Sequence, residues 1–303
     1  MGKILITPRS LTKEGHPALE LLKKAGHQVI TCTPGKMPDE AELLSLLPGC
    51  VGYLAGVEKV SARVLEAAKG LKVISRNGAG IDNVDLEAAQ RLGIQVRPAP
   101  GANARGVAEL TLALIFSLLR SLPWSDRQLK AQAWNRRQGL EVAGRTLGLV
   151  GCGNIGRIVV ELATAVGMKT MAYKRHPDPS FAPLHFRWVA PEELYSGADI
   201  ISLHCPAGAK PVIDREAIAK MKKGVYLVNT ARADVVDEQA MLAALDSGQV
   251  AGYAVDVFAQ EPPKDWKLAG HEKVIATPHV GGFTEESVSR ATADAVRNIL
   301  EVL

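Results

Sequence analysis

The sequence has few cysteines, no paired cysteine motif and almost no excess of charge of either sign. Its four cysteines, Cys32, Cys50, Cys152 and Cys205, form no C-x-x-C pair. This usage argues against a zinc site or a disulfide framework and fits a reducing cytoplasm. The formal net charge is +4 over 303 residues, which is too weak to indicate a nucleic-acid-binding surface. We therefore expect neither a metal ion nor a nucleic-acid partner.

Long apolar runs are also missing. The longest one, Leu110 to Leu119, contains Thr111 and Ser117 and falls short of the roughly 20 residues that a membrane-spanning helix needs. The sequence passes from Lys3 directly into an apolar run, without the layout of a signal peptide. We expect a protein of the cytoplasm with no membrane partner, and the length favours two domains.

Short apolar runs alternate with helical patterns along the whole chain. The first series predicts strands at residues 3–7, 29–31, 51–55, 71–75 and 94–96. The second predicts strands at residues 146–150, 169–173, 200–204, 225–229, 252–257 and 274–276. Strands separated by helices indicate right-handed crossovers and parallel sheets. The predicted fold class is α/β, with two doubly wound parallel sheets.

The alternation breaks once, at residues 97–101, where Pro98, Pro100 and Gly101 disfavour both helix and strand. We place a domain boundary there, with residues 1–98 and 284–303 in one domain and residues 99–283 in the other. The apolar helix expected at residues 104–119 is predicted to pack against another domain or subunit. A closing helix is expected from Thr284, which can cap it.

A glycine-rich turn, G-x-G-x-x-G, follows the strand at residues 146–150. Gly151 permits a tight turn, Gly153 lets the backbone approach a pyrophosphate, and Gly156 lets helix and strand pack closely. The free N–H groups of Asn154 and Ile155 at the helix start favour an anion. The turn therefore predicts a dinucleotide site, and a turn that merely packs a strand against a helix is the alternative.

The end of the next strand distinguishes the two nicotinamide dinucleotides. Enzymes that use NAD place Asp or Glu there, whereas an arginine can hold the 2′-phosphate of NADP. This sequence has Lys174 and Arg175 at that point and no carboxylate before Asp178. The two cations favour NADP. NAD beside a solvated basic loop is the other possibility.

Polar side chains follow three later strands, where ligands of open parallel sheets bind. Arg232 is suited to hold a substrate carboxylate, and His279 to protonate a developing alkoxide. Glu261 beside that histidine would keep it protonated. Singly, each has an ordinary structural explanation as an ion pair, a loop charge or a turn histidine. Their shared position after strands of a nucleotide-binding sheet favours a catalytic trio.

These segments resemble the D-isomer-specific 2-hydroxyacid dehydrogenase family over nearly the whole chain. The resemblance is carried by residues 76–85, the glycine turn, residues 229–238, residues 256–262 and residues 278–282. It implies a flavodoxin-like substrate domain and a Rossmann cofactor domain. It also implies catalysis by Arg232, Glu261 and His279, a small 2-keto or 2-hydroxy acid as substrate, and a homodimer with the helix near residues 104–119 at its interface.

The same resemblance implies further binding residues. The loop Arg76, Asn77, Gly78, Ala79 and Gly80 would bind the substrate, with its backbone N–H groups on the carboxylate. Asp256 would contact the nicotinamide amide. Additional cofactor contacts are implied for Cys205, Pro206, Thr230, Ala231 and Gly281.

Two subgroups of the family share features with this sequence. Arg76 and residues 81–85 look like phosphoglycerate dehydrogenase, whereas residues 173–175 look like the glyoxylate and hydroxypyruvate reductases that use NADP. Ala233 replaces a frequent glycine, and residues 207–210 lack the usual threonines near the cofactor. The substrate stays open between glyoxylate, hydroxypyruvate and 3-phosphoglycerate types. The alternatives are a nucleotide-sensing, corepressor-like binding protein and a dehydrogenase of formate or phosphonate-type anions.

Overall fold

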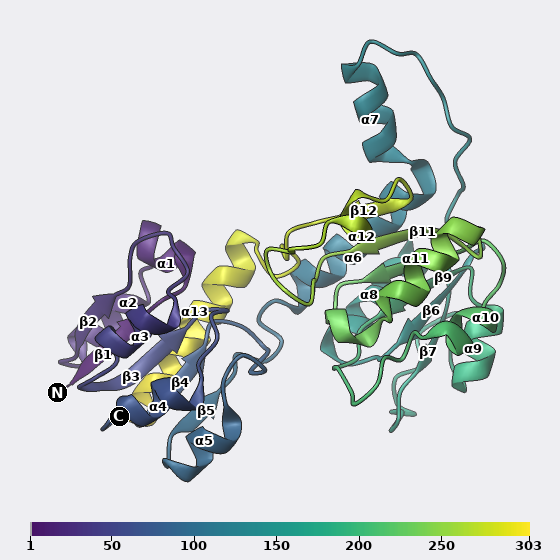
Figure 1. Cartoon of the computed structure of the whole chain (residues 1–303). Helices are drawn as coiled ribbons and strands as arrows, with labels where there is room; N and C mark the ends of the chain where they lie inside the picture. The colour runs from purple at the N-terminus through teal and green to yellow at the C-terminus, as the bar shows by residue number, and fades with distance from the viewer. Residues whose placement is uncertain (1) are drawn as a thin grey trace. The chain divides into compact units, whose positions relative to one another are not determined.

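The computed structural model describes residues 2–303, which divide into two compact units. Unit 1 holds the chain up to Asn103 together with Gly282–Leu303, and unit 2 holds Ala104–Gly281. Each unit has its own parallel sheet with helices on both faces (Figure 1). The predicted α/β class with two doubly wound sheets is confirmed.

The sheet of unit 1 has five parallel strands in the order β2-β1-β3-β4-β5, the flavodoxin-like order. The strands are β1 (Lys3–Ile6), β2 (Gln28–Thr31), β3 (Cys50–Ala55), β4 (Val73–Arg76) and β5 (Gln95–Arg97). The helices are α1 (Arg9–Glu14), α2 (Leu19–Lys24), α3 (Glu40–Leu46), α4 (Ala62–Ala67), α5 (Leu86–Arg91) and α13 (Glu285–Leu300).

Alternate strand residues of unit 1 enter two separate cores, because successive side chains of a strand point to opposite faces. Leu5, Tyr53 and Ile74 pack on the face that α3, α4 and α5 cover. Ile4 and Leu54 pack on the face that α2 and α13 cover. The predicted cap of the closing helix is confirmed, since the hydroxyl of Thr284 accepts a hydrogen bond from the N–H of Ser287.

The sheet of unit 2 has seven parallel strands in the order β12-β11-β10-β9-β6-β7-β8. The strands are β6 (Thr146–Val150), β7 (Lys169–Tyr173), β8 (Phe186–Trp188), β9 (Ile200–Leu203), β10 (Val225–Asn229), β11 (Val250–Val255) and β12 (Val274–Ala276). The helices are α6 (Ala104–Arg120), α7 (Leu122–Lys130), α8 (Asn154–Ala165), α9 (Pro191–Gly197), α10 (Arg215–Ala219), α11 (Glu238–Ser247) and α12 (Lys267–Gly270). The order places β6 beside β9, which creates the topological switch point of a Rossmann sheet.

Unit 2 also has a core on each face of its sheet. The helices α6 and α8 pack on one face, against residues such as Leu149 and Ala254. The helices α9, α10 and α11 pack on the other, against residues such as Leu227 and Tyr253. The apolar helix α6 is thus largely buried inside unit 2, which accounts for its composition without a second subunit.

The structure differs from the predicted boundaries in places. The boundary between the units follows Asn103 rather than Pro98, because Ala99 and Ala102 are buried beside Ala291 of α13. Residues 282 and 283 likewise belong to unit 1 rather than to the second domain. The short edge strand β8 and the helix α7, which has Pro123 in its first turn, were not predicted.

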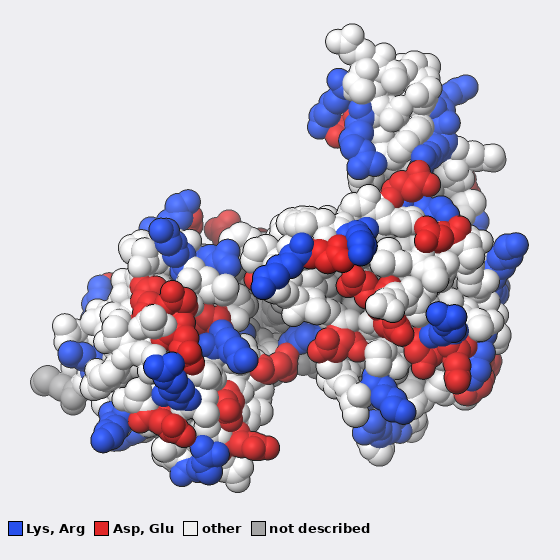
Figure 2. Space-filling model, viewed as in Figure 1, with Lys and Arg blue, Asp and Glu red and all other residues white. Residues whose placement is uncertain are grey.

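Charges of both signs are interspersed on the visible surface of each unit, without a large area of one sign (Figure 2). Among the described residues, no single helix is long and apolar enough to cross a membrane. The helices α6 and α7 are long and apolar enough only when taken together, and the chain bends by 62° where they join.

Candidate functional site

The residues expected at the cofactor follow strands that end at one edge of the sheet of unit 2. The glycine turn follows β6, and residues 230–232 follow β10. Residues 256–261 follow β11, and residues 277–281 follow β12. Because all these strands are parallel, their carboxyl ends meet at the same edge.

The glycine turn has the open geometry that a pyrophosphate requires. Gly151 adopts a φ of +93°, and a Cβ there would lie 2.5 Å from the carbonyl oxygen of His204. A Cβ on Gly156 would lie 2.9 Å from the carbonyl oxygen of Gly151, whereas nothing lies within 4 Å of the corresponding position on Gly153. Gly153 therefore faces open space at the start of α8, where the N–H groups of Asn154 and Ile155 are available to an anion. These residues fit a dinucleotide.

The loop after β7 contains two cationic side chains, and its first carboxylate is already hydrogen-bonded. Lys174 is half-buried and Arg175 is exposed. The positive charge of this region acts on the neighbouring Cys152. Burial raises the pKa of its thiol to about 11, and the charges of Arg157 and Lys174 oppose this rise. The carboxylate of Asp178 accepts hydrogen bonds from Ser180 and from Arg157, the latter at 2.6 Å. These bonds lower the pKa of Asp178 to about 2. The first carboxylate after Lys174 and Arg175 in the sequence is thus held by another arginine.

His279 and Glu261 form a directly hydrogen-bonded pair. The Nδ1 of His279 lies 2.7 Å from Oε2 and 2.9 Å from Oε1 of Glu261. The backbone N–H of Phe258 donates to Oε1 of the same carboxylate at 3.1 Å, which fixes its position. Among the described residues, Nε2 of His279 has no hydrogen-bond partner, so this nitrogen is the one available to a substrate.

The pair shifts both titrations in the direction that favours an imidazolium. The hydrogen bond with Glu261 raises the pKa of His279 above its ordinary value, although burial opposes the rise. Burial alone would raise the pKa of Glu261, but the hydrogen bond and charge of His279 outweigh it, and the pKa is lowered. The charge of Arg232 lowers the pKa of both groups, so the structure brings the three predicted catalytic side chains within electrostatic reach of one another.

Asn229, at the end of β10, positions the segment that carries Arg232. Its side-chain Nδ2 donates to the carbonyl oxygen of Arg232 at 2.9 Å, and its Oδ1 accepts from the N–H of Ala231 at 3.0 Å. Asn229 itself is fully buried. Sequence reasoning included Asn229 only as part of a motif and missed this positioning role. A buried amide at a strand end is the signal that points to it.

Asp256 holds the turn that presents His279. Its carboxylate accepts from the hydroxyl of Thr277 at 2.6 Å and from the N–H groups of Val280 and Gly281 at 2.9 and 2.8 Å. Asp256 is only 1% exposed, and His279 adopts a φ of +53°, a left-handed conformation that a side chain rarely adopts without support. The sequence analysis assigned Asp256 a cofactor contact and missed this structural role.

The other expected cofactor contacts lie beside the same strands. The hydroxyl of Thr230, which is buried, shares a hydrogen bond of 3.1 Å with Thr111 of α6. Cys205 is half-buried, and its backbone nitrogen would lie 2.7 Å from a Cβ on Gly151, whereas Pro206 is exposed. Among the described residues, no group of three or more His, Cys, Asp or Glu side chains is placed to hold a metal ion.

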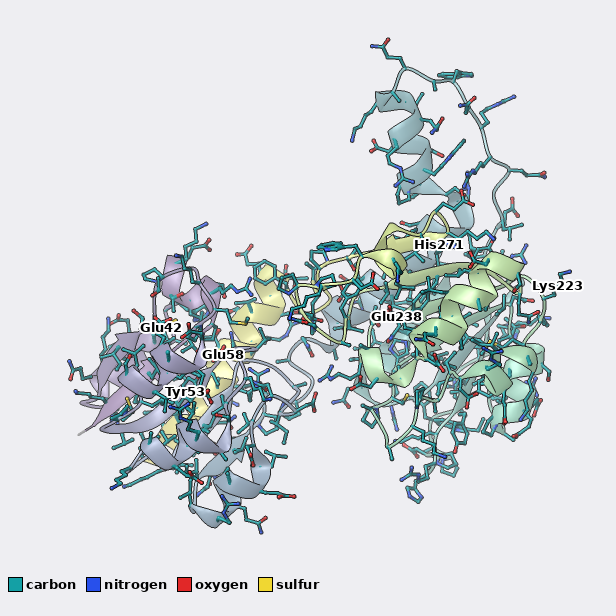
Figure 3. The ribbon with its side chains drawn as sticks, in the orientation of Figure 1. Glu42, Tyr53, Glu58, Lys223, Glu238 and His271 are labelled. Carbon is teal, nitrogen blue, oxygen red and sulfur yellow. The ribbon has the colours of Figure 1, made fainter. Side chains whose placement is uncertain are left out.

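The expected substrate loop follows β4 in unit 1. The guanidinium of Arg76 donates to the carbonyl oxygens of Gly80 at 3.0 Å and Ala55 at 2.9 Å, and the residue is buried. Asn77 accepts from the hydroxyl of Thr292 of α13. Arg76 and Asn77 thus shape the loop, while Gly78 and Gly80 are half-buried and Ala79 is exposed. A neighbouring cluster, in which the buried Glu58 accepts from Tyr53 at 2.5 Å (Figure 3), was not anticipated from the sequence.

Known proteins are similar to this chain in sequence and in fold. Residues 112–281 match the family described as D-isomer specific 2-hydroxyacid dehydrogenase, NAD binding domain. The chain is 41% identical over 281 residues to a D-3-phosphoglycerate dehydrogenase of Sus scrofa, a match that covers 89% of this chain and 51% of that protein. It is 40% identical over 273 residues to a hydroxypyruvate reductase of Thermotoga maritima, with 88% and 89% covered.

A solved structure extends the likeness to the whole described fold. An NAD-dependent formate dehydrogenase of Staphylococcus aureus in complex with NAD superposes with a TM-score of 0.88 at 28% identity, covering 99% of this chain and 94% of that one. The chain spans about half the length of the curated phosphoglycerate dehydrogenases that it matches, and most of the length of the hydroxypyruvate reductase.

Proposed function

The chain belongs to the D-isomer specific 2-hydroxyacid dehydrogenase family, and from that premise we propose that it interconverts a small 2-keto acid and the corresponding D-2-hydroxy acid. The reaction is an NAD(P)-dependent oxidoreduction at a CH–OH group. The observation that carries the proposal is the bond of 2.7 Å between Nδ1 of His279 and Glu261. It leaves Nε2 as a proton donor with a raised pKa.

When bound, the nicotinamide supplies the hydride. In the direction of reduction, His279 donates the Nε2 proton to the substrate oxygen as negative charge develops on it. Glu261 stabilises the imidazolium before the transfer and orients the ring through Nδ1. Arg232 holds the substrate carboxylate and polarises the neighbouring carbonyl. In oxidation, the neutral imidazole accepts the hydroxyl proton, so the same residues serve both directions.

We assign cofactor binding to unit 2 and part of substrate binding to unit 1. The glycine turn and the start of α8 would hold the pyrophosphate, and Thr230, Ala231, Cys205 and Pro206 would line the nicotinamide half. Asp256 retains an acceptor position for the nicotinamide amide beside the bonds that it makes to the turn. In unit 1, the backbone N–H groups of Gly78 to Gly80 would contribute to binding of the carboxylate.

We propose NADP as the preferred cofactor, with NAD as a weaker one. Lys174 and Arg175 would pair with the 2′-phosphate. The carboxylate of Asp178 already pairs with Arg157 and Ser180, so it is less available to ribose hydroxyls than the acidic residue of an NAD enzyme.

We propose a homodimer in which α7 and the segment after it contact the second copy. No residue of α7 is buried, and Leu122, Leu129 and Trp134 are 51%, 58% and 83% exposed. Figure 1 shows this segment projecting from the rest of unit 2. Apolar side chains exposed along a projecting segment favour a protein partner. The four cysteines are free thiols, and a compartment that keeps thiols reduced, such as the cytoplasm, is the proposed location.

The direct test is the loss of absorbance of NADPH and of NADH with glyoxylate, hydroxypyruvate, pyruvate and 3-phosphohydroxypyruvate. We expect turnover with at least one of these acids. We also expect His279→Ala and Arg232→Ala to lower kcat/KM at least about 100-fold without loss of folded structure. Lys223→Ala is the matched control, because Lys223 precedes β10 at its opposite end and is exposed. Near-normal rates in both site variants would refute the proposed roles.

A further inference from the structure

Unit 2 contains a cavity that borders the site described above but is lined by neither the glycine turn nor the three catalytic side chains. Its volume is about 350 Å³, within the lower part of the range of small-molecule pockets. Its polar wall includes Lys210, Asp234 and Glu238, and its apolar wall includes Tyr253, Val257 and Phe258. Figure 3 shows Glu238 at the start of α11.

The strand residues that line the cavity point to the face of the sheet opposite to the one that α8 covers. Tyr253 and Val255 of β11 line it and belong to the core beneath α9, α10 and α11. Ala254, between them, belongs to the core beneath α6 and α8. The helix that begins at the glycine turn is α8, so a molecule in the cavity would leave the pyrophosphate position open.

Two walls of the cavity continue into the segments that carry the catalytic side chains. Phe258 lines the cavity, and its backbone N–H holds the carboxylate of Glu261. Ala233 and Asp234 line it directly after Arg232. Val255 lines it and lies opposite Asn229 in the register of β10 and β11, and the Nδ2 of Asn229 donates to the carbonyl oxygen of Arg232. An occupant would therefore contact the supports of both Arg232 and Glu261.

The charged side chains of the cavity indicate which class of molecule it would bind. Lys210, Asp234 and Glu238 are exposed, and among residues 2–303 none of the three forms an ion pair or a side-chain hydrogen bond. Two carboxylates against one ammonium group favour a cationic head, and the apolar wall accepts a short hydrocarbon body. We propose that this cavity is an effector site for a small molecule that carries a primary ammonium group on a short apolar chain.

Such an ammonium group is found both in simple alkylamines and in free amino acids. Three probes with a matched branched body separate these sources, namely 3-methylbutylamine, L-leucine and 4-methylpentanoate. We expect the first two to bind and the last, which lacks the ammonium group, not to bind. Lys210→Gln is expected to weaken binding of L-leucine, because Lys210 can pair with its carboxylate. The same variant is expected not to weaken binding of 3-methylbutylamine, which has no carboxylate.

The experiment is calorimetric titration of the full chain with 3-methylbutylamine. We expect Glu238→Gln to raise the dissociation constant about fivefold and Asp234→Asn/Glu238→Gln to abolish measurable binding. Glu161→Gln on α8, which removes an exposed carboxylate on the other face, is expected to bind as the parent does. Binding that is equal in the parent and the double variant, absent from both, or displaced by NADPH would overturn the site.

The effector role has a separate readout. With the best keto acid found, a saturating concentration of the amine is expected to change kcat at least twofold in the parent and to leave Asp234→Asn/Glu238→Gln unchanged. Tight binding with the same kcat would overturn the coupling to Arg232 and Glu261. Because the titration requires no turnover, failure of the proposed dehydrogenase activity would leave the binding result interpretable.

Discussion

At the scale of single residues, the buried carboxylate of Asp256 determines where His279 points. It accepts three hydrogen bonds from the turn after β12, two of them from backbone N–H groups. A charged acceptor compensates for the left-handed backbone of His279, which a histidine would not otherwise favour. Catalytic geometry at this site therefore depends on a residue that lies one layer behind the imidazole.

We predict that Asp256→Asn lowers the free energy of unfolding by about 2 kcal/mol, because in either orientation the new NH₂ group faces an N–H or O–H donor. Urea denaturation measures this change. The same variant is expected to lower kcat, since the turn no longer holds His279. Asp246→Asn, at an exposed carboxylate, is the control and is expected to be neutral. An Asp256→Asn protein as stable and active as the parent would contradict the role assigned to this turn.

At the scale of elements, the loop after β7 decides the choice of cofactor. We predict that Lys174→Ala/Arg175→Ala raises the KM for NADPH at least about tenfold and that for NADH less than about twofold, because only NADPH carries the 2′-phosphate. Steady-state kinetics with each cofactor measure both values. Lys169→Ala changes an exposed lysine at the opposite end of the same strand and is expected to affect neither cofactor. Equal increases for NADPH and NADH would eliminate the phosphate clamp.

The elements also show which features the sequence makes predictable. Strands such as β6 and β10 are continuous apolar runs of the kind that buried parallel strands require, and G-x-G-x-x-G marks the start of α8. The edge strand β8 has only three residues of mixed burial, so its pattern is too short to be recognised. The helix α7 follows α6 after a single residue, Ser121 in a left-handed conformation, and sequence periodicity does not reveal such a bend.

The sequence likewise made part of the site predictable. Arg232, Glu261 and His279 stand out because each is a charged or titratable residue in the loop that follows an apolar strand. Asn229, Phe258 and Asp256 hold the segments that carry these three side chains. Their roles depend on tertiary contacts, which a single sequence does not display. The observed domain boundary lies a few residues after the predicted one for the same reason. Ala99 and Ala102 are buried beside α13, and this is a tertiary contact that the sequence does not reveal.

At the scale of the whole molecule, the projecting segment predicts self-association. Leu122 and Leu129 are seven residues apart on α7 and share one face. We predict that the parent sediments as a dimer and that Leu122→Glu/Leu129→Glu sediments as a monomer, because the charges would be buried at the interface. Sedimentation velocity measures both. Leu184→Glu, at an exposed loop position, is the control. A monomeric parent, or a variant that remains dimeric, would contradict the proposed interface.

The whole account depends on proton transfer by His279 under the control of Glu261. Reduction requires the imidazolium, so its rate should be constant at low pH and fall as the pH rises through the raised pKa of His279. Removal of the carboxylate in Glu261→Gln lowers that pKa, because the hydrogen bond to Glu261 is the main cause that raises it. The falling limb of the profile should then move to lower pH, whereas Glu272→Gln, at an exposed position, should not move it.

The most direct measurement is the pH dependence of kcat/KM for reduction of the best keto acid by the parent and by Glu261→Gln. We predict that the Glu261→Gln profile falls at a lower pH than the parent profile, with a reduced maximum. Profiles that fall at the same pH in both proteins would contradict the claim that the pair of His279 and Glu261 delivers the proton.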